Sequence, residues 1–167
     1  KKFTCSLIDM IKEKFSLSTE VEAVLKLLDE LEKWLPSYKK MIDIEEALDE
    51  ISNNEFETYY RIFTMMNYEH PKPLLFRAFC LMQEDRIAVK DLTRLWKSCT
   101  LYMLQFKSIM NQDSKSSIKV FSDLCSDVYI SENIDVDNVV KKLNESLLNK
   151  SITEDVLIKT FVNCDLY

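Results

Sequence analysis

The sequence predicts an all-α protein, a multi-helix bundle of about eight or nine helices, because three observations agree. Apolar residues recur at steps of three and four along nearly the whole chain, as they do on one face of a helix. None of the 167 residues is glycine, so the tight two-residue turns of β-hairpins are difficult to build. No segment carries a clear strand pattern.

The length fits one domain or two small lobes with a sizeable core. The clearest break is the sequence HPKP at residues 70–73, since a residue that precedes proline is pushed out of the helical region. It predicts an N-terminal helical lobe at residues 1–70 and a C-terminal helical lobe at residues 71–167, which either stand apart or pack as one domain.

Two helices are expected before residue 43. The first covers residues 3–15, and the second begins behind Ser18 or Thr19, of which Thr19 fits a capping box with Glu22. Pro36 falls inside the second helix and predicts a kink near Leu35 or a break with a restart. Steps of three and four separate its apolar residues Val21, Val24, Leu28, Leu31, Leu35, Tyr38 and Ile42.

Such a seam needs a partner helix. With only three heptads, packing inside the chain's own bundle is expected, and a coiled-coil dimer is the alternative.

The remaining helices follow from the same spacing. We expect short helices at residues 44–51 and 55–66, a buried helix at 74–83 that is apolar almost all round, and a long helix at 90–110. A polar loop at residues 111–116 leads to three closing helices, at residues 117–128, 136–148 behind Asp135, and 154–161 behind Thr153.

Candidate catalytic residues are lacking. Without glycine there is no phosphate-binding loop, no dinucleotide fingerprint and no nucleophile elbow. His70 is the single histidine, and its place before Pro71 indicates a turn residue. Adjacent acids such as Glu45 and Glu46 fit the first turn of a helix, where they complement its dipole. We therefore expect no catalytic, cofactor-binding or metal-binding residue, and no enzyme activity in this segment.

The five cysteines, at positions 5, 80, 99, 125 and 164, form no C-x-x-C pair, and their number is odd. Free thiols and a cytoplasmic protein are expected. No targeting segment or membrane-spanning run is evident, so no membrane partner is expected. The missing initiator Met predicts a piece of a longer protein, with a trimmed small protein as the alternative.

Charge is unevenly distributed. Residues 1–71 have a net charge of −6, residues 72–119 of +5 and residues 120–167 of −5. Within the middle block, Arg86, Lys90, Arg94 and Lys97 form a basic stripe at helical spacing. These four are the candidate contacts to DNA phosphates. The alternatives are pairing with the acidic lobes or a solvated face.

The order of these segments resembles the helical middle region of GmrSD-type bacterial proteins. The resemblance rests on residues 7–15 (LIDMIKEKF), 27–34 (LLDELEKW), 38–40 (YKK), 70–75 (HPKPLL), 91–96 (DLTRLW) and 120–124 (VFSDL). In that family a ParB-like nucleotide-hydrolysing part and an HNH nuclease part flank such helices, and members include modification-dependent restriction enzymes that act against phage. The chain departs from the family at Lys107, where members tend to have Arg, and in the following loop, where members often have Gly and Asn and this chain has Asn111 and serines.

The resemblance implies a non-catalytic helical scaffold or linker within a restriction or phage-defence protein. Its partners would be flanking domains of the same chain, with weak contact to the DNA backbone. The alternative is a stand-alone helical adaptor, of viral or bacterial origin, that binds a partner helix in a groove.

Overall fold

The computed structural model describes residues 12–131 and 133–163, and within these residues every regular element is helical. The predicted all-α class is confirmed. The elements are α2 (Glu20–Ile42), α3 (Ile44–Leu48), α4 (Asn54–Met65), α5 (Lys72–Gln83), α6 (Val89–Met103), the π-helical segment η1 (Leu104–Ile109), α7 (Ser114–Ser131), α8 (Val136–Asn149) and α9 (Glu154–Asn163).

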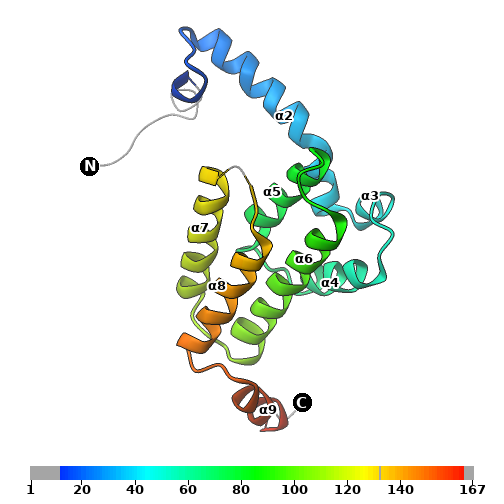
Figure 1. The fold of residues 1–167 in the computed structure, drawn as a ribbon, viewed down its shortest axis with the longest axis vertical. Coiled ribbons are helices and arrows are strands. Elements are labelled where there is room, and N and C mark those ends of the chain that lie inside the picture. The colour runs from blue at the N-terminus through cyan, green and yellow to red at the C-terminus, as the bar shows by residue number, and fades with distance from the viewer. Residues whose placement is uncertain (1–11, 132, 164–167) are drawn as a thin grey trace, which may run out of the picture.

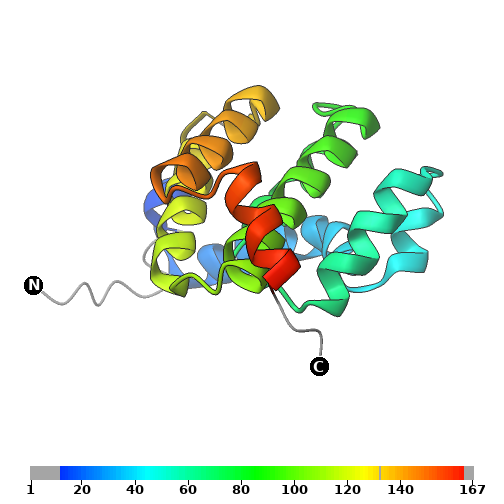
Figure 2. The same cartoon turned by 90° about the horizontal axis from the view of Figure 1, so that it is seen from below.

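Helix α6 is the centre of the packed body. It contacts α4, α5 and α8, while α7 packs against α5 and α8 (Figures 1 and 2). Helix α2 lies differently, because it packs on α5 and α3 and then extends beyond the body at the top of Figure 1. The fold is therefore a helical bundle with one projecting helix.

Trp96 of α6 sits at the middle of the core and is fully buried. Its indole stacks on the Tyr60 ring with centroids 4.7 Å apart, and the Phe63 ring meets it edge-on at 5.0 Å. Phe56 and Phe79 complete the cluster. Because these side chains come from both sides of residues 70–73, one continuous core spans that turn.

Helix ends are built without glycine. Asn67, Asp85 and Ser151 each follow a helix and have positive φ angles of 50°, 55° and 57°. After α8, the amide of Ile152 donates to the carbonyl of Leu147 at 3.0 Å, which is the bond of a Schellman motif. Non-glycine residues thus take the left-handed position that glycine usually occupies.

Most expected boundaries among the described residues agree with the structure to within about three residues, and two details differ; the helix expected at residues 3–15 lies largely outside the described residues. The capping box of Thr19 and Glu22 is present, and both of its hydrogen bonds form. Of the two alternatives expected at Pro36, the break with a restart is wrong, since α2 is one continuous helix from Glu20 to Ile42. The long helix expected at residues 90–110 changes to a π-helical turn after Met103.

Candidate functional site

Helix α2 has two unlike faces. Its inner face carries the buried Ala23, Ser37 and Lys40. Ser37 hydrogen-bonds Gln83 of α5, and Lys40 forms an ion pair with Glu50. These contacts fix which side of the helix is turned toward the body.

The outer face is an exposed row of large apolar side chains, which we call the apolar seam. Individual exposure runs from 39% for Val24 to 69% for Val21. In the part of the chain that the structure describes, fourteen large hydrophobic residues are exposed, and eight of them belong to this one helix. The eight seam residues are Val21, Val24, Leu25, Leu28, Leu31, Leu35, Tyr38 and Ile42.

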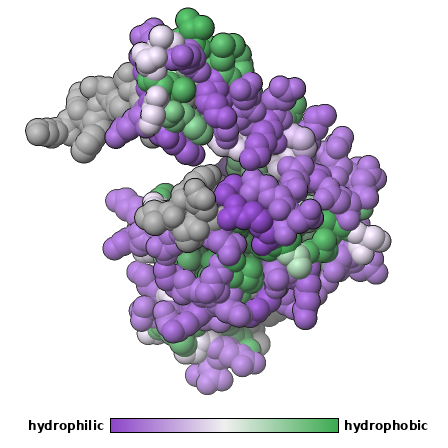
Figure 3. Space-filling model, turned by 45° about the horizontal axis from the view of Figure 1, so that its top comes forward, coloured by the Kyte–Doolittle hydropathy of each residue, from purple (hydrophilic) through white to green (hydrophobic). Residues whose placement is uncertain are grey.

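The expectation that this seam packs inside the chain's own bundle is therefore wrong for the described residues. The inner stripe is made by Ala23, Ser37 and Lys40 together with the partly buried Leu27 and Trp34, so the helix is rotated relative to that expectation. The rings of Trp34 and of Phe76 on α5 form a T-shaped pair with their centroids 6.5 Å apart. In the space-filling view, apolar residues lie along the outer edge of the projecting segment (Figure 3).

The seam repeats with the period of a coiled coil. Seven of its residues follow steps of three and four, so they take the a and d positions of three heptads, and Leu25 widens the row at an e position. At its C-terminal end, Ile42 also lines a hollow of about 470 Å³ with Ile44 and Met65. The apolar surface therefore continues from α2 onto the start of α3 and the end of α4.

Two charged residues border the seam at the following e positions. Glu32 and Lys39 are both exposed, and neither has an ion-pair partner among the described residues. Neither residue was among those predicted to form a site, although their heptad positions in the sequence could have identified both. They offer opposite charges along one edge of the seam.

The basic stripe is less uniform than its spacing suggested. Arg86 lies in the connection between α5 and α6 rather than on a helix, and its guanidinium is 3.1 Å from a Glu84 carboxylate oxygen. Lys90, Arg94 and Lys97 are on α6 and line one hollow of about 410 Å³. Only three of the four predicted residues are thus brought together on one helix.

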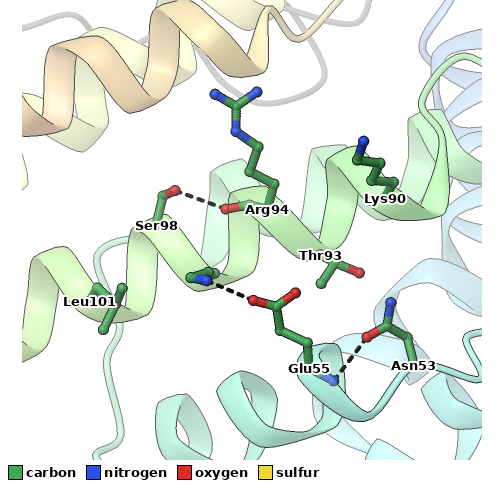
Figure 4. A pocket seen from close by; sticks show the side chains of 8 residues that line it. Asn53, Glu55, Lys90, Thr93, Arg94, Ser98 and Leu101 are labelled. Carbon is green, nitrogen blue, oxygen red and sulfur yellow. Dashed lines mark hydrogen bonds and ion pairs between the residues drawn. The ribbon is translucent and has the colours of Figure 1, made fainter.

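Acidic side chains from neighbouring helices form ion pairs with two of these three basic residues. Arg94 is 2.6 Å from Asp137 of α8, and Lys97 is 2.7 Å from Glu55 of α4. Figure 4 shows Arg94 reaching away from Glu55, and a dashed line ends on the Glu55 carboxylate, which accepts the hydrogen bond of Lys97. The hydrogen bond from Lys97 to Glu55 raises the pKa of Lys97. The net positive charge at this hollow is therefore reduced.

His70 lies in a turn, as expected, with its Nδ1 atom 2.9 Å from the Ser117 hydroxyl. This pair lacks the geometry of a nucleophile and its base, because Ser117 is fully buried and donates its proton to the Ser114 carbonyl. Burial and the nearby Lys107 lower the pKa of His70, while Glu69 opposes them.

Other candidate chemistry can be placed within the described residues. They contain no cluster of three or more His, Cys, Asp or Glu side chains arranged to hold a metal. Cys80, Cys99 and Cys125 are free thiols, and burial raises the pKa of each. Cys5 and Cys164 lie outside the described residues. None of the helices described is long and apolar enough to cross a bilayer.

Comparison with known proteins returns no match to a family model, a curated protein or a solved structure.

Proposed function

We propose that this chain is a non-catalytic helical scaffold that docks a partner helix on the apolar seam of α2. The observation that carries the proposal is the exposure of eight large hydrophobic residues on one projecting helix. Monomeric soluble proteins rarely leave a contiguous apolar patch of this kind uncovered, and such patches usually mark interaction sites.

The spacing of the seam defines the chemistry of its occupant. Knobs-into-holes packing needs a partner whose apolar residues repeat every 3.5 residues, so the occupant is an amphipathic helix with Leu, Ile or Val at its a and d positions. An extended peptide would present its side chains with a period of two and would not follow these positions.

Burial of the seam is large enough to support association. Covering a large aliphatic side chain completely contributes about 1.5–3 kcal/mol, and about half of each seam residue remains to be covered. Eight such residues supply on the order of 6–12 kcal/mol before costs. The loss of translational and rotational freedom costs about 4–15 kcal/mol, so weak to moderate affinity is expected.

The wider setting that we propose is a helical spacer within a modification-dependent restriction or phage-defence protein. This rests on the resemblance to the GmrSD-type middle region, and any catalysis would then belong to flanking parts. A cytoplasmic location is supported by the free thiols of Cys80, Cys99 and Cys125. The stand-alone adaptor is the alternative, and docking on α2 is common to both.

Contact with DNA phosphates is a second candidate function. It is supported by Lys90, which is exposed and lines the same hollow as Arg94 and Lys97. Docking is the stronger proposal, because Asp137 and Glu55 already neutralise two of these three cations.

The test of docking uses a synthetic amphipathic peptide with Leu at every a and d position and a fluorescent label. Its anisotropy should rise with the parent protein and not with a Leu28→Lys/Leu35→Lys variant. Both leucines are about half exposed, so the variant should keep its fold. Leu148→Lys on α8 is the matched control, because Leu148 is 62% exposed and lies outside the seam. Equal binding by all three proteins, or by none, would refute the proposal.

A further inference from the structure

We propose that the helix that covers the apolar seam is α2 of a second copy of this chain, packed antiparallel to the first. The inference rests on the proposed docking function and names its partner. It is carried by the self-complementary spacing of the seam and by the opposite charges of Glu32 and Lys39 along its edge.

The seam fits its own copy. A two-fold axis places the same face of both helices together, so each copy supplies the 3.5-residue period that the other requires. With the axis near residue 33, every seam position from 24 to 42 meets an apolar residue. The facing pairs are Leu35 with Leu31, Leu28 with Tyr38 and Ile42 with Val24, each formed twice.

Charge favours the antiparallel direction. In that arrangement the e positions of one helix run beside the e positions of the other, so Glu32 lies between Glu32 and Lys39 of the partner copy, and Lys39 is its opposite charge on both sides of the axis. A parallel pair would instead set the e positions against Leu27, Trp34 and Met41, which are partly buried against the chain's own body. Only the antiparallel pair therefore gives both unpartnered charges an opposite charge.

The position of α2 leaves room for a second copy. The helix has 23 residues and is therefore about 35 Å long, and part of it extends beyond the body in Figure 1. The seam runs along nearly its whole length, from Val21 to Ile42. A symmetric pair would cover the seams of both copies at once, leaving no second apolar face to recruit further chains.

The experiment is sedimentation velocity on the whole chain over micromolar to near-millimolar concentrations. The parent should form a concentration-dependent dimer. Glu32→Lys alone and Lys39→Glu alone should each weaken it about tenfold, because like charges then meet twice. The double variant Glu32→Lys/Lys39→Glu should restore the parent affinity, and an equimolar mixture of the two single variants should form heterodimers, since opposite charges again meet.

Circular dichroism of each variant controls for folding, and both substituted residues are exposed. A parent that stays monomeric at every concentration overturns the inference, as does a dimer that the charge reversals leave unchanged. If the parent is monomeric while the labelled amphipathic peptide still binds, the docking function stands, and only the identification of the partner as a second copy is wrong. If neither association occurs, both proposals fail.

Discussion

Lys97 and Glu55 form an ion pair of 2.7 Å that ties the middle of α6 to the first turn of α4. The same ammonium group lies 5.5 Å from the centroid of the Tyr59 ring. Together with the 2.6 Å contact between Arg94 and Asp137, this pair makes the basic stripe part of the contacts between helices. The stripe can therefore contact DNA only where its cations remain accessible beside these acids.

The first prediction concerns that contact. Binding of a labelled DNA duplex should be weak, independent of sequence and visible only at low salt, with a dissociation constant of about 10⁻⁴ M or weaker. The net charge of −6 opposes binding, and salt screens the few cations available. Fluorescence anisotropy of the parent and an Arg86/Lys90/Arg94/Lys97→Glu variant tests this. Equal anisotropy with the parent and the variant at low salt would show that these four residues do not bind DNA.

The second prediction concerns pH. Burial raises the pKa of Tyr60 to about 12 and also raises the pKa of Cys99 above its usual value. Both groups are neutral when protonated, and the folded state holds the proton more tightly than the unfolded state. Their contribution to stability is thus complete well below pH 9, the pKa of the unfolded thiol, and is lost as the pH rises through and beyond that value.

Urea denaturation at a series of pH values from 7 to 11 measures this effect. The free energy of unfolding should fall above pH 9. The free energy of unfolding of the Tyr60→Phe variant should fall less steeply over the same range, although this variant also loses the 3.0 Å hydrogen bond to the Lys40 carbonyl. A parent whose stability stays level up to pH 11 would contradict the burial of these groups.

The third prediction uses the left-handed residue after α8. Ser151 has a φ angle of 57°, which a residue with a Cβ atom adopts at a cost of about 1–2 kcal/mol. Ser151→Gly should therefore raise the free energy of unfolding by about 0.5–1 kcal/mol, after the greater freedom of glycine in the unfolded chain is subtracted. Ser122→Gly, in the interior of α7, should lower it. Two shifts of the same sign would contradict this account of the helix end.

The fourth prediction is that all five cysteines are free. Under denaturing and non-reducing conditions a thiol reagent should count five per chain. In the native protein Cys80 and Cys99 should react slowly, because burial raises the pKa of both thiols and leaves little thiolate. A denatured count of three or one would show a disulfide and argue against a reducing compartment.

Much of the fold could be predicted because helices leave a strong periodic signal. The capping box at Thr19 and Glu22 located the start of α2, and Asn67 and Asn111 occupy left-handed positions where a helix ends. The alternative of a break at Pro36 arose because local rules penalise proline inside a helix, whereas α2 continues through Pro36 and holds it at an exposed position.

The candidate site was only half predictable. The spacing of Leu28, Leu31 and Leu35 identified the seam, but sequence alone does not tell a core face from a docking face, since both are apolar at the same period. The face that is buried holds Ser37 and Lys40, whose burial depends on Gln83 and Glu50 elsewhere in the chain. Such pairings over long sequence distances have no local signal.

Residue-level carbene footprinting of the seam tests the central claim most directly. The dilute protein is labelled with and without an excess of the amphipathic peptide, and modification of Leu28, Leu31 and Leu35 is compared with that of Leu148. The docking account predicts strong labelling of the three seam residues in the dilute protein and a large loss of it when the peptide is added, with Leu148 unchanged. Seam labelling that the peptide does not alter would contradict the account.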